Sequence, residues 1–125
     1  MRFADLIADA LEAGRDRLNR ADTLRRLNDS FRRTFADGHV VPTRGVMLLD
    51  PTDWRTLFRA VRDFDSFNAE DDPYGEHDFG ALAFKGVRYF WKIDYYDLDL
   101  RNASPDPTDP AFTMRVMTIM RADEY

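Results

Sequence analysis

Residues 78–96 read DFGALAFKGVRYFWKIDYY, and this stretch decides the fold. Residues 78–84 and 87–96 are two runs rich in aromatic and apolar side chains, and Lys85-Gly86 separates them. Two such runs joined by a two-residue turn that contains glycine predict a β-hairpin. The hairpin is expected to be the centre of a small antiparallel sheet.

The second strand of this hairpin has an alternating pattern. Side chains point to opposite faces along a strand, so Trp91, Ile93 and Tyr95 are expected on one face, with Trp91 and Ile93 turned toward helices. The other face is expected to carry Phe90, Lys92, Asp94 and Tyr96.

The N-terminal part of the chain has helical periodicity. Apolar residues recur every three or four positions through residues 3–18 and again through residues 24–35, and the two stripes do not join smoothly around residues 21–23. The pattern leaves open whether residues 1–35 form one helix or two. Asp37-Gly38 is the expected C-terminal cap.

The remaining elements complete an α+β pattern. Residues 39–41 and 45–49 are predicted to be short strands, a helix is predicted to begin at Asp50-Pro51, and residues 113–120 are predicted to form the last strand. Helices followed by hairpin-connected strands indicate N-terminal helices packed on a small antiparallel sheet. The length of 125 residues indicates a single α+β domain over residues 1–125.

Composition excludes several classes of site. The chain has no cysteine and two histidines, which excludes disulfides, thiolate nucleophiles, zinc ribbons and iron–sulfur clusters. The three serines form no nucleophile elbow, and the glycines form no phosphate loop or dinucleotide fingerprint. We therefore predict no cofactor and no metal site.

The densest polar cluster lies at the open end of the hairpin. Pairing around Lys85-Gly86 brings residues whose numbers sum to about 171 or 172 opposite each other, which places His77 near Asp94. A carboxylate beside the imidazole would fix its tautomer and raise its basicity, as in a general base or a metal ligand. The catalytic candidates are Glu76, His77, Asp78, Lys92 and Asp94, and the competing interpretation is that His77 stiffens a loop.

Negative charge is concentrated in one stretch. The net charge of the chain is −5, whereas residues 62–109 hold five basic and twelve acidic residues. An acidic surface repels nucleic acid and favours a basic protein partner. The candidate binding residues are Glu70, Asp71, Asp72, Asp97 and Asp99.

Three motifs resemble a known family: GEHDFG at residues 75–80, FWKIDYYD at residues 90–97, and TIM with a terminal EY between residues 118 and 125. Leu27-Asn28-Asp29 and residues 43–46 are similar to its opening motifs. The family is a bacterial domain-of-unknown-function family, and the resemblance covers residues 25–125, so residues 1–22 are expected to be an N-terminal helical extension. Its members are typically encoded on plasmids and mobile elements. This context implies an accessory role, such as countering restriction or CRISPR defence, and assigns no catalytic residue.

Two hypotheses follow. In the first, the protein is a small acidic, cytoplasmic binding protein that acts on a protein partner with a basic surface, with no direct contact to nucleic acid or membrane. In the second, it is an enzyme or metal-binding domain centred on His77 and the nearby carboxylates. The sequence leaves the oligomeric state open.

Overall fold

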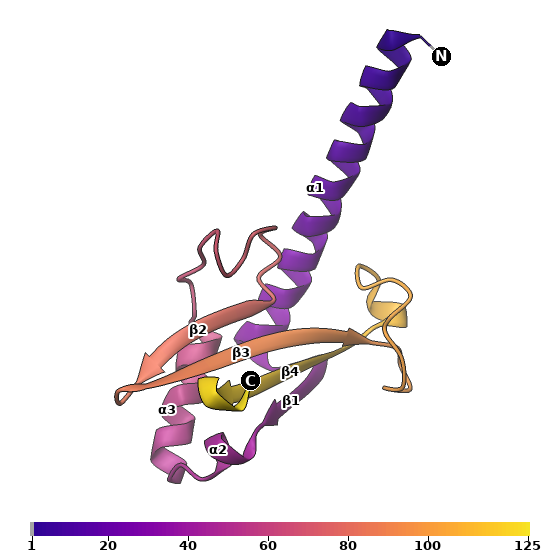
Figure 1. Ribbon diagram of the computed structural model, residues 1–125. Coiled ribbons are helices and arrows are strands. Elements are labelled where there is room, and N and C mark those ends of the chain that lie inside the picture. Colours follow the sequence, from indigo (N-terminus) through magenta and orange to yellow (C-terminus); the bar gives the residue numbers. More distant parts are fainter. Residues whose placement is uncertain (1) are drawn as a thin grey trace.

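The computed structural model describes residues 2–125, which form four strands, three α-helices and two 3-10 helices (Figure 1). In chain order these are α1 (Phe3–Thr34), β1 (Gly38–Pro42), α2 (Arg44–Met47), α3 (Pro51–Arg62), β2 (Phe79–Phe84), β3 (Val87–Tyr96), η1 (Pro110–Phe112), β4 (Met114–Arg121) and η2 (Ala122–Glu124).

The four strands form one sheet in the order β1-β4-β3-β2. The hairpin of β2 and β3 pairs Phe79 with Lys92, and β3 pairs antiparallel with β4. These pairings confirm the predicted hairpin and the α+β class. The sheet is mixed rather than wholly antiparallel, because β1 pairs parallel with β4. Parallel strands start at the same end of a sheet, so the chain must return to that end between β1 and β4. Helix α3 and the β2–β3 hairpin lie in this connection.

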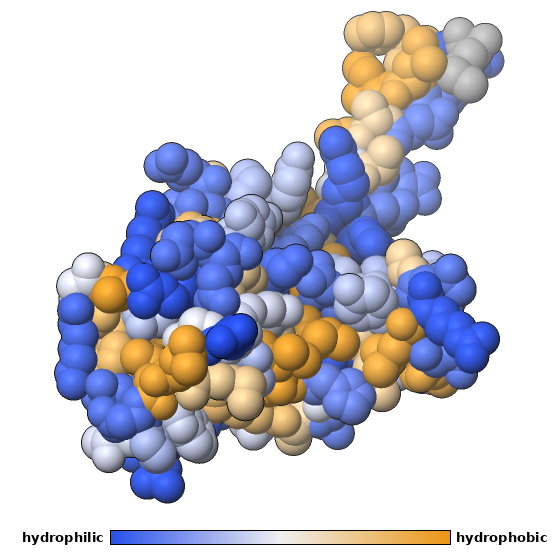
Figure 2. Space-filling model, turned by 60° about the horizontal axis from the view of Figure 1, so that its bottom comes forward, coloured by the Kyte–Doolittle hydropathy of each residue, from blue (hydrophilic) through white to orange (hydrophobic). Residues whose placement is uncertain are grey.

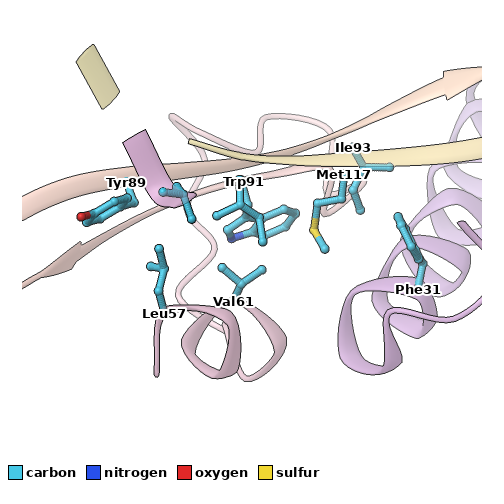
Figure 3. Close-up of a cluster of buried hydrophobic side chains, with 9 residues drawn as sticks. Phe31, Leu57, Val61, Tyr89, Trp91, Ile93 and Met117 are labelled. Atoms are coloured by element: carbon cyan, nitrogen blue, oxygen red, sulfur yellow. The ribbon is translucent and has the colours of Figure 1, made fainter. Parts of the chain in front are cut away.

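The core lies between the sheet and the helices α1 and α3. Trp91 is fully buried and Ile93 is 4 % exposed, so the face predicted to meet the helices does so. Figure 3 shows these side chains with Met117 from β4, facing Val61 of α3 and Phe31 of α1. The C-terminal helix η2 contacts β3. The Tyr125 ring lies against Phe79 and Phe90, which are on the opposite face from Trp91.

Residues 45–49, predicted to be a strand, do not form one. Residues 44–47 instead form the short helix α2, in which Val46 is fully buried and Met47 is exposed. The Glu124 carboxylate accepts hydrogen bonds from the Thr43 hydroxyl (2.7 Å) and the Gly45 amide (3.0 Å). A distant acidic side chain therefore holds the first turn of α2, and nothing in the local sequence indicates this contact.

The N-terminal periodicity belongs to one helix, which settles the alternative left open by the sequence. Helix α1 continues through residues 21–23, where Asp22 accepts a hydrogen bond from Arg25 within the helix. It ends at Phe35, whose φ of 58° gives a left-handed cap, and not at Asp37-Gly38. Gly38 instead begins β1.

The first half of α1 projects from the rest of the molecule (Figure 1). We call residues 3–20 the arm. Every residue of the arm except Gly14 is exposed, whereas Leu24, Asn28, Phe31 and Arg32 in the second half of α1 are buried. No helix within residues 2–125 combines the length and the apolar character needed to cross a membrane.

Replacement of Trp91 by alanine tests the core. Trp91→Ala should lower the free energy of unfolding by about 3–5 kcal/mol, because it removes a large buried ring and leaves a cavity. Leu48→Ala is the control, because Leu48 is 74 % exposed. It should cost less than about 1 kcal/mol. Urea denaturation followed by tryptophan fluorescence and circular dichroism measures both values, and equal stability of the two variants would contradict the assigned core.

Candidate functional site

His77 lies in the loop between α3 and β2, and its backbone turns sharply. Its φ is 55°, and its amide donates a hydrogen bond to Asp72 Oδ1 at 3.2 Å. The imidazole stacks on the Phe67 ring, with 3.5 Å between centroids and 2° between planes. Phe67 in turn packs edge-on against Trp91. The His77 side chain is therefore directed toward the helix-covered face of the sheet.

Both ring nitrogens of His77 face carboxylates. Nδ1 lies 2.8 Å from Asp29 Oδ1, and Nε2 lies 3.6 Å from Asp72 Oδ2. Arg32 Nη1 donates to the same Asp29 oxygen at 2.9 Å. Burial raises the pKa of Asp29, but the hydrogen bonds from His77 and Arg32 outweigh burial and hold the pKa below its usual value. An ionised carboxylate only accepts hydrogen bonds, so Nδ1 is the donor to Asp29.

The predicted pairing of His77 with Asp94 is wrong. Asp94 lies on the opposite face of the sheet, where its Oδ2 is 3.2 Å from Lys92 Nζ. The hairpin register brings Asp78, not the imidazole, against β3, since the Asp78 carbonyl accepts a hydrogen bond from the Ile93 amide at 2.8 Å. The left-handed backbone at His77 then turns its side chain to the other face. The five catalytic candidates therefore do not converge on one site.

Glu76 and Asp78 have no basic partner within the loop. Burial raises the pKa of both carboxyls, and the negative charges of neighbouring carboxylates, including Asp72, raise it further. Within residues 2–125 no group of three or more histidine, aspartate or glutamate side chains is arranged to hold a metal ion. The arrangement thus lacks the converging ligands that the metal hypothesis requires.

A second polar network, which the sequence did not predict, joins α1 to the sheet. Asn28 is fully buried and donates to the Tyr95 hydroxyl at 2.8 Å and to the Glu76 carbonyl at 3.0 Å. Arg115 Nε donates to Asn28 Oδ1 at 2.9 Å, and its Nη2 donates to the Pro107 carbonyl at 2.6 Å. Burial raises the pKa of Tyr95 to about 12, although the hydrogen bond from Asn28 opposes this rise. The one sequence signal for this network was the polar residue Asn28 within the otherwise apolar helical stripe of residues 24–35.

The proposed acidic surface is not continuous. Asp72 is only 8 % exposed, because it holds His77, and it belongs to the interior. Asp97 is used in its own turn, where it accepts hydrogen bonds from the Arg101 and Asn102 amides. The loop of Glu70 and Asp71 and the loop of Asp97 and Asp99 lie on either side of α1 (Figure 1). Helix α1 also places cations between them, with Arg25 bonded to the Gly75 carbonyl and Arg20 3.9 Å from Asp106.

Removal of the Asp29 charge tests the role of the His77 network. Asp29→Asn should destabilise the protein by about 3 kcal/mol, because it leaves the buried Arg32 cation without its carboxylate. The stability that Asp29 contributes is present above the pKa of the unfolded chain and is lost as pH falls through the lowered folded pKa. The difference from wild type should therefore persist from pH 7 to about pH 4 and shrink below it.

Thermal melts from pH 3 to pH 8 measure this difference. Asp16→Asn on the exposed arm is the matched control and should have no effect at any pH. An Asp29→Asn protein as stable as wild type at pH 7 would show that the network does not hold the loop.

Asp78→Asn should have the opposite effect. A raised folded pKa means that the ionised carboxylate is disfavoured in the folded state, and this cost is present above the folded pKa and absent below the unfolded pKa. The substitution should raise the melting temperature at pH 7, and the gain should vanish below about pH 4. The same melts test it, and a loss of stability at pH 7 would reveal a hydrogen-bonding role for the carboxylate.

Comparisons with known proteins place the chain in a family. The family described as "Protein of unknown function (DUF3768)" matches residues 42–124. No curated protein matches the chain, and no solved structure matches it. The matched residues begin at the end of β1, so the arm and the α1 side of the His77 network lie outside the match. The chain belongs to this family of proteins of unknown function.

Proposed function

We propose that the protein acts as a binding protein, and that the arm is its docking element. One observation carries this proposal. Five large apolar side chains of the arm are about half exposed or more: Phe3, Leu6, Ile7, Leu11 and Leu18. Figure 2 shows hydrophobic surface along the projecting helix.

The apolar side chains lie on one side of the helix. Ile7, Gly14, Ala21 and Asn28 recur every seven residues, so the apolar side of the arm continues into the side that the rest of α1 buries. Each of the larger side chains would contribute about 1.5–3 kcal/mol if it were buried. The arm therefore has the amphipathic pattern of a helix that packs against something.

Docking would also stabilise the arm. Most helical stability in proteins comes from packing an apolar face. The arm makes no such contact with the described body, and Gly14 weakens it by about 1 kcal/mol relative to alanine. Docking would supply the missing stabilisation.

The exposed apolar side chains specify the chemistry of the partner surface. The acidic side chains in the first part of the arm, Asp5, Asp9 and Glu12, lie on the side of the helix away from the apolar stripe. The partner surface therefore needs an apolar groove, and the expectation of a basic partner rests on the acidic residues 62–109 instead. Inhibition of a restriction or CRISPR enzyme is a narrower form of this proposal, and its support is the acidic net charge of −5.

Photo-crosslinking in cells that produce the full chain tests the docking element. A photoreactive phenylalanine analogue at Leu11 should give a covalent adduct with a single polypeptide, identified by mass spectrometry. The same analogue at Asn19, on the polar side of the arm, is the matched control and should give little adduct. Equal adducts from both positions, or none from Leu11, would contradict the proposal.

A further inference from the structure

We propose that a cleft between the second half of α1 and the loop after β3 binds a small carboxylate with an apolar body, and that this ligand pairs with the buried cation of Arg115. No residue of the arm lines the cleft, so the inference does not depend on the proposed docking role. Two features support it: a buried cation without a counter-ion, and an apolar cleft that this residue lines.

Arg115 is a buried cation that lacks a counter-ion among the described residues. It is 4 % exposed. Its Nε donates to Asn28 Oδ1 and its Nη2 donates to the Pro107 carbonyl, and both acceptors are neutral. The guanidinium lies over the Tyr95 ring, 5.2 Å from the centroid. Within residues 2–125 it forms no ion pair, and burial lowers its pKa. Because a guanidinium stays protonated in proteins, its positive charge is uncompensated.

Arg32 shows what the fold provides for a comparable cation. Arg32 is also fully buried, and the Asp29 carboxylate lies 2.9 Å from its Nη1. Burial of a charge costs less when an opposite charge lies beside it. Arg115 has only neutral acceptors, and its Nη1 makes no hydrogen bond within residues 2–125. This nitrogen is not fully enclosed, so it remains available to a ligand.

The cleft that Arg115 lines has the size of a small-molecule site. Its volume is about 460 Å³, and ligand pockets in proteins typically have about 300–1,000 Å³. Its lining is mostly apolar and includes Leu27, Phe31, Gly38, Leu98, Pro110 and Arg115. A ligand in this cleft would make apolar contacts along its body and one charged contact at Arg115.

These features specify the class of ligand. A carboxylate matches a guanidinium because it accepts charge-assisted hydrogen bonds from it. One uncompensated cation favours a ligand with a single negative charge. Asp37 also lines the cleft, but it is exposed, so solvent screens its charge more than that of Arg115. The apolar lining favours a hydrocarbon body, because a sugar or a nucleotide would leave polar groups without partners there.

Octanoate is the probe that tests the site, and octanamide is its matched uncharged control. In NMR titrations of the purified full chain, octanoate should shift the backbone amide signals of Gly38, Leu98 and Thr113, which line the cleft. Octanamide should bind at least about tenfold more weakly, because it lacks the charge that pairs with Arg115. Octanoate should also raise the melting temperature, since it binds the folded chain.

Two substitutions in one loop test the apolar part of the cleft. Leu98 lines the cleft and is 57 % exposed, whereas Leu100 is 45 % exposed in the same loop and does not line it. Leu98→Asp places a negative charge beside the ligand and should weaken octanoate binding at least about tenfold. Leu100→Asp is the matched control and should leave the affinity unchanged. Both side chains are exposed, so both variants should fold.

Two changes of charge test the role of Arg115. Arg115→Gln removes the cation and should abolish the preference for octanoate over octanamide. Asp37→Asn removes the exposed negative charge from the cleft and should tighten octanoate binding by up to about fivefold. The same substitution should leave octanamide binding unchanged.

The outcomes distinguish the cleft from the arm. If octanoate does not bind wild type at concentrations up to about 10 mM, or if octanamide binds equally well, the proposal is overturned. Amide shifts confined to the arm, at residues such as Leu11 and Leu18, would place the ligand on the apolar side of the arm and also overturn it. If Arg115→Gln does not fold, the Leu98 and Leu100 variants and Asp37→Asn decide the question. The photo-crosslinking test of the arm stands or fails independently of these results.

Discussion

The buried guanidinium of Arg32 is the constraint on which the interior depends. Its side chain has no exposed surface, and it lies over the rings of Phe67 and Trp91 at 5.3 and 5.2 Å. A buried cation is costly unless a carboxylate and hydrogen-bond acceptors surround it. Asp29 and the Phe64 carbonyl fill these roles, although Nε has no partner. Helix α1 must therefore keep one position against the α3–β2 loop and the hairpin.

His77 extends this constraint to the loop. It shares Asp29 with Arg32 and stacks on the same Phe67 ring that lies beneath the guanidinium. A histidine whose ring nitrogens face carboxylates and whose ring is covered by an aromatic side chain is held in place rather than presented to a substrate. The geometry thus favours the structural interpretation of His77 over the catalytic one.

The sequence predicted those features of the fold that residues close together in the chain determine. The turn at Lys85-Gly86 and the alternation through Trp91 were sufficient for the hairpin, its register and its buried face, because both signals are local. The parallel pairing of β1 with β4 and the helix held by Glu124 depend on residues far apart in the chain. The position of His77 was missed because one left-handed residue turns its side chain to the other face of the sheet.

Most of the buried polar side chains among the described residues hold parts of the fold together. The arm, in contrast, makes no comparable contact with the rest of the described chain. Asn28, Asp29 and Arg115 each form a hydrogen bond that joins α1 to the loop or the sheet. The arm lies beyond all of these contacts, yet it keeps an apolar stripe in phase with the buried side of α1. An exposed helix needs no such stripe for solubility, and exposing it favours association. We therefore propose that the stripe serves in binding, and an apolar groove is the kind of partner surface that would cover it.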